Sequence, residues 1–185
     1  MYAVRRTYVK QWDCQPPEER YEVHVTRGGK PVTDISPERI SYVEEDVMQW
    51  RKANHIHHWF VENVQDGNDN GGDYCVPSEQ LAELLVLCEK VIEASELVDG
   101  EVSNGEVYDF ESETWQAKAV PGKVIKDPSV AKELLPTIEG FFFGSQDYDE
   151  SYLEDVVETR DWIVQTLAEE VESETSSCIH YSSSW

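Results

Sequence analysis

The sequence is short of basic residues and of the motifs that identify common enzyme classes. It has 15 Lys and Arg against 38 Asp and Glu, which gives a formal net charge of −23. Such a charge repels phosphate groups, so bare nucleic acid and anionic membranes are disfavoured as partners. The chain has no GxSxG nucleophile motif, no P-loop and no GxGxxG dinucleotide motif. A non-enzymatic role is therefore favoured, although the sequence does not decide the question.

Cysteine is also scarce, and long apolar runs are absent. The four cysteines (Cys14, Cys75, Cys88 and Cys178) include no CxxC pair and no Cys/His spacing of a zinc module. Cys88 lies on the apolar stripe of a predicted helix, where we expect a small core residue. No signal peptide is apparent, and no run approaches the roughly 18–20 apolar residues of a membrane span. We expect a reducing, cytoplasmic setting and no membrane partner.

Apolar and aromatic residues are nevertheless sufficient for a packed core. They make up 39% and 11% of the 185 residues, respectively, which suits one folded domain. We expect this domain over residues 1–172, with an N-terminal β part (1–35) and a helical core (36–172). The Ser-rich segment 173–185 is expected to be a flexible tail.

Apolar spacing predicts an α+β fold with a long central helix. Residues 2–12 and 21–35 are typical of antiparallel strands, and the second segment is a hairpin around Gly28-Gly29. Ser36-Pro37 is typical of a helix start, and apolar residues then recur at alternating spacings of three and four up to Val64. Further predicted elements are helices over 78–94, 127–135 and 148–171, and a small β excursion at about 100–120 with turns at Asn104-Gly105 and Pro121-Gly122.

The second half of the central helix, Trp50–Gln65, is expected to be buried on most sides. Asn54 and His57 lie on its apolar stripe and are predicted to form internal hydrogen bonds. Phe141–Phe143 is the segment expected to pack against it.

Two groups on this helix and the loop after it are candidate metal ligands. His55, His58 and Glu62 share one helical face, since their spacings are i,i+3 and i,i+4. Residues Asp66-x-Asn68-x-Asn70-Gly71 match the first half of an EF-hand calcium loop, but Pro77 stands at position 12, where Glu is required. A solvated turn is the favoured interpretation of 66–73, and no other cofactor is expected.

Negative charge is concentrated late in the chain. Residues 1–60 are neutral, and 139–174 contain twelve acidic residues against Arg160 alone. Helix capping explains the acids at 147–150 but not those that follow. The residues predicted to form an acidic partner-binding surface are Asp147, Asp149, Glu150, Glu154, Asp155, Glu158 and Asp161.

Two strings of residues are distinctive: WRKANxIHxWFVxNVQDG at 50–67 and LLPTxxGFFFGSxDYDE at 134–150. They resemble a family of uncharacterised proteins encoded by bacteriophages and prophages, and the resemblance covers roughly residues 43–170. It implies a viral origin and action in the host bacterial cytoplasm, and it carries no functional residue with it.

These features favour an acidic binding protein that inhibits a host defence or nucleic-acid-processing system, as anti-CRISPR proteins do, with DNA mimicry as one mechanism. Its partner would be a host protein with a basic surface, such as a nuclease or defence effector; self-association is left open. One alternative is sequestration of a small signalling nucleotide, which requires a basic patch. The candidates for that patch are Arg5, Arg6, Lys10, Arg51 and Lys52. Another alternative is a metal-dependent hydrolase that uses the face of His55, His58 and Glu62.

Overall fold

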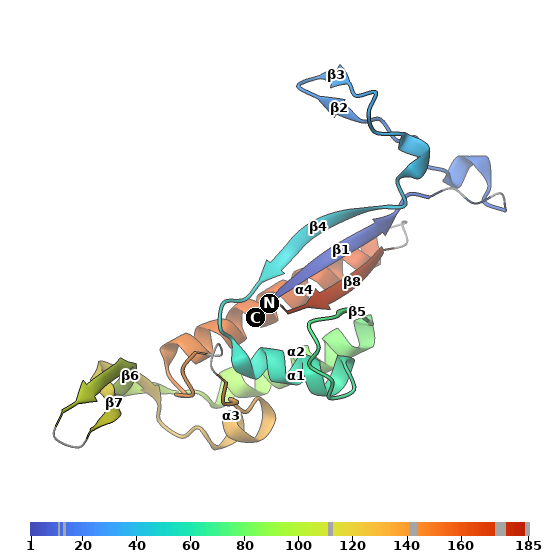
Figure 1. The fold of residues 1–185 in the computed structure, drawn as a ribbon. Helices are drawn as coiled ribbons and strands as arrows, with labels where there is room; N and C mark the ends of the chain where they lie inside the picture. The colour runs from blue at the N-terminus through green and yellow to red at the C-terminus, as the bar shows by residue number, and fades with distance from the viewer. Residues whose placement is uncertain (11, 13, 111–112, 141–143, 173–176, 184–185) are drawn as a thin grey trace.

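A four-stranded antiparallel sheet joins segments that are far apart in the sequence. Its strands lie in the order β4 (Tyr42–Gln49), β1 (Tyr2–Tyr8), β8 (Ser177–Ser182) and β5 (Asp73–Val76). In Figure 1 the sheet lies in front of the long helix α4 (Glu150–Glu172). The computed structural model describes residues 1–10, 12, 14–110, 113–140, 144–172 and 177–183.

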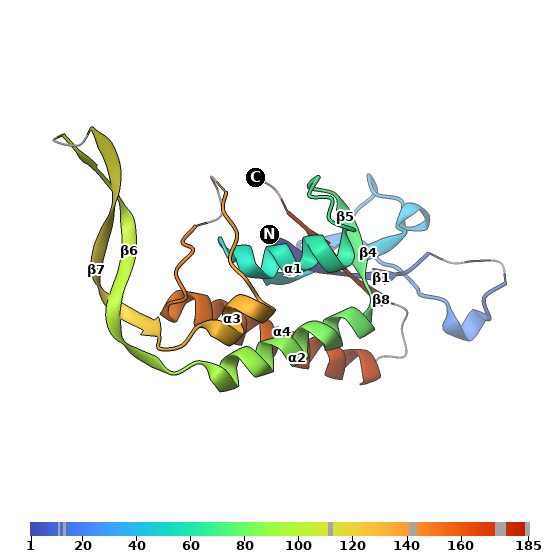
Figure 2. The ribbon, with the colours of Figure 1, turned by 90° about the horizontal axis from the view of Figure 1, so that it is seen from below.

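The helices supply the rest of the core. They are α1 (Asn54–Val64), α2 (Ser78–Ala94), α3 (Ser129–Leu134) and α4. Helices α2 and α4 pack side by side, as Figure 2 shows. Ser78, at the start of α2, donates its hydroxyl to Glu170 near the end of α4, so the two helices run in opposite directions.

Aromatic rings connect strand β8 to helix α1. Tyr181 is fully buried and stacks on Phe60, with ring centroids 4.0 Å apart and planes 8° from parallel. Trp50 contacts both rings, and its indole Nε1 donates a 2.8 Å hydrogen bond to Thr159 of α4. Nδ1 of His57 lies 2.6 Å from the hydroxyl oxygen of Tyr181, and Nε2 lies 3.3 Å from a carboxylate oxygen of Asp69.

Two long projections leave this body at opposite ends (Figures 1 and 2). One is the two-stranded ribbon of β6 (Leu97–Asp109) and β7 (Thr114–Ile125). The other comprises residues 9–41. It carries two short 3-10 turns, η1 (Pro17–Glu19) and η2 (Pro37–Arg39), and the small hairpin of β2 (Thr26–Arg27) and β3 (Lys30–Pro31).

The α+β prediction is confirmed, as are the helices near 78–94, 127–135 and 148–171. The hairpin at Gly28-Gly29 is confirmed, and both glycines have positive φ. The helix predicted from Ser36 to Val64 is wrong in its first half, because 37–39 form a 3-10 turn and 42–49 form β4. Residues four apart share a face in a strand as well as in a helix, so Val43 and Val47 fit both elements.

The β excursion is longer than expected, and its turns are elsewhere. Asn104-Gly105 lies at a register shift between Ser103 and Glu106, and Pro121-Gly122 lies inside β7. Gly122 pairs with Gly100, where a β-carbon would lie 2.6 Å from a methyl group of Val124. These glycines therefore leave room for the side chains of Val124 and Val102 and do not form a turn.

The predicted flexible tail is wrong for residues 177–183. Residues 177–182 form β8, which lies between β1 and β5, and Ile179 and Tyr181 are buried. A domain that ended at residue 172, as predicted, would therefore exclude β8 from the sheet to which it belongs. The composition is Ser-rich, yet its apolar residues alternate as a half-buried strand requires.

Cys75 and Cys178 form a disulfide that joins β5 to β8 across a sequence separation of 103 residues. The expected reducing setting is therefore not confirmed. Cys88 is buried and free, as expected. Every helix in the described ranges is either too short or too polar to cross a lipid bilayer. The expected packing of Phe141–Phe143 on α1 concerns residues outside the described ranges.

Truncating Tyr181 tests the position of β8. Tyr181→Ala should cost about 3–5 kcal/mol of unfolding free energy, because it removes a buried ring from the core. Tyr181→Phe keeps the stack but removes the hydroxyl beside Nδ1 of buried His57, which should cost about 1–3 kcal/mol. Urea denaturation measures both, with Val171→Ala as the control because Val171 is 88% exposed. A cost for Tyr181→Ala as small as that of the control would contradict the buried strand.

Candidate partner-binding cleft

A cleft of about 210 Å³ opens where the start of α1, the 137–149 loop and the first turns of α4 meet. Its two walls belong to the two strings at 50–67 and 134–150, together with the next turns of α4. Five of the seven predicted acidic residues line it: Asp147, Asp149, Glu154, Asp155 and Glu158.

Asn54 holds the loop that forms one wall. It is 1% exposed, its side-chain nitrogen donates to the carbonyl of Ser145 (2.9 Å), and its side-chain oxygen accepts from the backbone N–H of Ile138 (2.9 Å). The expectation that Asn54 forms internal hydrogen bonds is confirmed. One amide therefore ties the loop to α1 at two points.

Gly144 brings the loop against the other wall. Its φ is +82°, and a β-carbon there would lie 2.9 Å from the β-carbon of Lys52. Lys52 itself has φ 67°, a value uncommon for a residue with a side chain. Only glycine suits both the backbone conformation and this close approach.

Two of the predicted acids have structural roles. The carboxylate of Asp149 accepts from the backbone N–H of Tyr152 (2.9 Å) and thus satisfies a free N–H in the first turn of α4. The carboxylate of Asp147 accepts from the backbone N–H of Ser103 (2.7 Å), which connects the loop to β6. Helix capping therefore explains Asp149, and strand contact explains Asp147.

His55 lines the cleft as a neutral ring. It is 2% exposed, and burial lowers its pKa to about 3. Its ring lies 4.2 Å from that of Tyr152, whose hydroxyl donates to the carbonyl of Leu135 (2.9 Å). Within the described residues, Nε2 of His55 is buried without a hydrogen-bond partner. Such an atom carries a desolvation cost that a ligand could relieve.

Asp155 lies in a region of negative electrostatic potential within the cleft. Burial, and after it the charges of Glu158, Glu154 and Asp149, together raise its pKa to about 7. Arg51 and Lys52 line the same cleft, yet neither forms a salt bridge within the described part of the chain. Among the described residues, no carboxylate of the cleft is therefore paired with a cation in a salt bridge.

The two other predicted acids, Glu150 and Asp161, lie on the exposed side of α4 and do not line the cleft. Asp161 pairs with its neighbour Arg160. Together with Glu154 and Glu158 they form a row at spacings of 4, 4 and 3 residues, which places all four on one helical face.

The predicted metal ligands are not brought together. His55 is buried, His58 is partly buried and Glu62 is exposed. Among the described His, Cys, Asp and Glu residues, the one group of three with ligand atoms within 4.8 Å is Cys75, Cys178 and His180. The hydrolase hypothesis therefore gains no support.

The 66–73 loop forms a turn bonded to its neighbours. The side-chain oxygen of Asn70 accepts from the backbone N–H of Gly72 (2.8 Å) and the hydroxyl of Tyr74 (3.1 Å). Asp66 has positive φ, and Asp66 and Asn68 are exposed. The amide oxygen of Asn70, a candidate calcium ligand, thus already accepts hydrogen bonds from two protein groups.

Comparison of the chain with protein-family models, with curated proteins and with solved structures finds no match.

Replacing Gly144 should disturb the cleft wall. We expect Gly144→Ala to cost more than the roughly 1–2 kcal/mol of a left-handed L-residue, because its β-carbon also meets Lys52. Gly105→Ala is the matched control, since Gly105 has φ +75° and open space around it. Urea denaturation of both variants measures the difference. Equal costs would show that the loop does not approach Lys52.

The raised pKa of Asp155 predicts a pH-dependent effect of Asp155→Asn. The native carboxyl is protonated below about pH 7, whereas the unfolded one ionises near its ordinary value. Stability is therefore lost between about pH 4 and pH 7, where the unfolded carboxyl has ionised and the native one still holds its proton, and the loss levels off above about pH 7. Asp155→Asn should raise the melting temperature more at pH 8 than at pH 5. The control Asp161→Asn, on the exposed side of α4, should show no such difference.

Proposed function

We propose that this chain is a binding protein whose acidic cleft and adjoining α4 face receive a basic surface of another protein. The observation that carries this proposal is the convergence of five carboxylates on one cleft, where burial and the repulsion of neighbouring carboxylates together raise the pKa of Asp155 to about 7. A cationic group from a partner would relieve that repulsion, and its binding energy would come in part from this relief.

The size of the cleft favours a single side chain as its occupant. Pockets for small organic ligands commonly measure roughly 300–1,000 Å³, whereas this cleft measures about 210 Å³. An arginine head group is planar and forms paired hydrogen bonds with carboxylates such as Glu154 and Glu158. Neutral His55 offers a further polar contact. One arginine held in this way would act as the central anchor of the interface.

The row on α4 extends the acidic surface beyond the cleft. Spacings of three and four residues correspond to a rise of about 4.5–6 Å along the helix. Phosphates of one DNA strand follow each other every 3.4 Å or so along the axis. The row therefore carries charge less densely than DNA does. The negative charge of the row would let this protein compete with nucleic acid for a basic surface, and the arginine bound in the cleft would supply the specificity.

The resemblance to phage and prophage proteins suggests where such a partner would act. A bacterial nuclease or defence effector has a basic groove for nucleic acid, and an acidic inhibitor bound there would block it. We therefore propose inhibition of a host nucleic-acid-processing or defence protein as the biological role.

The basic residues required for nucleotide sequestration do not form one patch. Arg5 pairs with Glu169, and Arg6 pairs with Glu44 and Asp73. Arg51 and Lys52 lie among the carboxylates of the cleft. An anionic ligand would meet repulsion there, so the structure favours a cationic partner.

An arginine-rich peptide of nine residues tests the proposal by calorimetry. We expect it to bind more tightly than a nine-residue lysine peptide. Affinity should weaken as the pH falls from 8 to 6, because Asp155 becomes protonated in that range and a neutral carboxyl attracts the cation less. Added salt should weaken binding further.

Two triple variants, each of which removes three negative charges, provide the comparison. Glu154→Gln, Asp155→Asn and Glu158→Gln together change the cleft and the acidic row. Glu62→Gln, Glu79→Gln and Glu83→Gln together change exposed residues on α1 and α2. The first set should lose affinity at least tenfold and lose the pH dependence. Equal losses in both sets would show that only net charge matters and would refute a specific cleft.

A further inference from the structure

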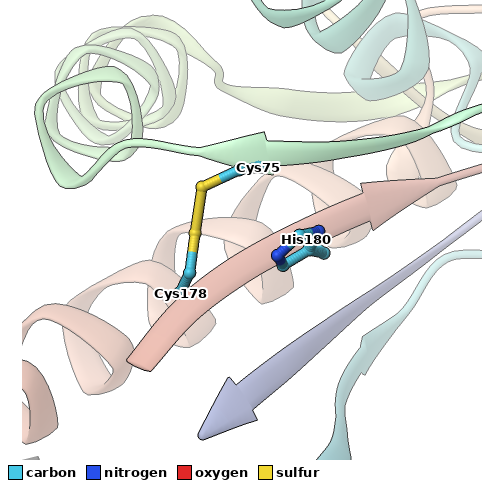
Figure 3. Close-up of side chains that lie close together, drawn as sticks. All are labelled: Cys75, Cys178 and His180. Carbon is cyan, nitrogen blue, oxygen red and sulfur yellow. A yellow bond between two sulfur atoms is a disulfide. The ribbon is translucent and has the colours of Figure 1, made fainter. Parts of the chain in front are cut away.

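Cys75, Cys178 and His180 lie together on one face of the β5–β8 pair, as Figure 3 shows. Cys75 is directly opposite His180 in the strand register, and Cys178 precedes His180 by two residues on β8. Side chains two apart on a strand share a face. Ile179 and Tyr181 point to the opposite face, into the core. The antiparallel pairing of β5 and β8 thus brings Cys75 beside Cys178 and His180.

The three side chains offer two sulfur atoms and one imidazole nitrogen within 4.8 Å of one another. Tetrahedral zinc binds sulfur at about 2.3 Å and nitrogen at about 2.0–2.1 Å, so its ligand atoms lie about 3.3–3.8 Å apart. The backbones are already placed for this, since the Cα atoms of the two cysteines are 6.4 Å apart. Small side-chain rotations after reduction would complete the geometry.

His180 has the surroundings of a metal-ligating histidine. Its side chain is 12% exposed, and its Nδ1 lies 3.3 Å from a carboxylate oxygen of Asp73. Asp73 also pairs with Arg6, which lies 3.0 Å from the same Nδ1 and pairs with Glu44 as well. Arg6 can only donate, so its contact makes Nδ1 an acceptor and leaves the ring proton on Nε2 in the metal-free protein. Zinc binding through Nε2 would move that proton to Nδ1, which lies close enough to Asp73 to donate to it. Histidines that bind metals commonly donate their second ring N–H to a carboxylate in this manner.

Nε2 of His180 is also buried without a hydrogen-bond partner among the described residues. A buried imidazole nitrogen without a partner is costly. Coordination of a metal beside the two sulfur atoms would satisfy it. The disulfide alone does not explain why an unpaired nitrogen and its carboxylate partner are adjacent to the cysteines.

We propose that reduction of the Cys75–Cys178 disulfide converts this group into a zinc site with Cys75, Cys178 and His180 as ligands. A dithiol reductant supplies two electrons and two protons, so that the S–S bond becomes two thiols and the reductant becomes a disulfide. Binding of Zn²⁺ then releases the two thiol protons and forms two Zn–S bonds. The fourth position is open to water or to a side chain of another molecule, as in Cys₂His zinc sites.

The two forms exclude each other, because a sulfur atom in a disulfide is not a thiolate ligand. Each form nevertheless links β5 to β8. An oxidising setting provides the covalent link, and a reducing setting with available zinc provides the metal link. The inference is independent of the acidic cleft, which these residues do not line.

The test uses the full chain, purified without metal, in its oxidised form and after reduction by a non-metal-binding phosphine. Zinc content is measured after addition of Zn²⁺ and desalting. We expect one zinc per reduced chain and none per oxidised chain. Co²⁺ in place of zinc should give sulfur-to-cobalt charge-transfer absorption in the reduced chain only. No zinc in the reduced chain, or equal zinc in both forms, would overturn the proposal.

Variants separate these ligands from general thiol binding. Cys14→Ser with Cys88→Ser keeps the site and should bind zinc as the parent does. His180→Ala should weaken zinc affinity at least tenfold. Asp73→Asn should weaken it about 10- to 100-fold by removing the carboxylate behind the imidazole. Unchanged affinity in the His180 and Asp73 variants would contradict the assignment.

A measurement on the unmodified protein tests the same site if the variants do not fold. Zinc should protect Cys75 and Cys178, but not exposed Cys14, from alkylation of the reduced chain, as read by peptide mass spectrometry. Buried Cys88, whose pKa is raised to about 12 by its surroundings, is expected to react slowly with or without zinc. Equal alkylation of Cys75 and Cys178 with and without zinc would refute the site.

Discussion

The stacking of Tyr181 on Phe60 holds the sheet against the helices. It places strand β8 against helix α1 in the core, and the His57 contact fixes the direction of the Tyr181 hydroxyl. Trp50 lies beside both rings and reaches Thr159, whose hydroxyl in turn donates to the backbone carbonyl of Asp155. The same aromatic group that closes the sheet thus sets the position of the helix turn that carries the cleft carboxylates. Packing in the core and charge at the surface are parts of one arrangement.

Electrostatic cost is concentrated in one place on this protein. Most exposed acids face water and contribute little individually, but Asp155 is partly buried among like charges. A fold that keeps such a residue retains a local instability that binding can remove. This is a common property of functional sites, and it separates the cleft from the general negative charge of the chain.

Sequence patterns anticipated the elements whose period is unambiguous. Helix α2 is predictable because Leu81, Leu84, Cys88 and Val91 recur over about three turns, and all four are buried. The strand β4 was mistaken for helix, because Val43 and Val47 satisfy either period and Pro37 suggested a helix start. Strand β8 was missed because serine-rich composition suggested disorder, while its partners β1 and β5 are distant in sequence.

The acids of the cleft were predicted from charge density alone. The role of Asn54 in holding the loop was visible only as a polar residue in an apolar stripe, and the disulfide required a register that no local pattern contains.

The order of strands has a consequence for synthesis of the chain. Strand β1 pairs with β8 from Tyr2↔Ser182 to Thr7↔Ser177, so its partner is synthesised 170 to 180 residues later. Until residues 177–182 leave the ribosome, β1 can pair only with β4, and its other edge stays open. Open edges recruit other strands, and such distant pairing folds slowly. The nascent protein therefore passes through a stage that depends on its own late segment, or on a chaperone, to avoid aggregation.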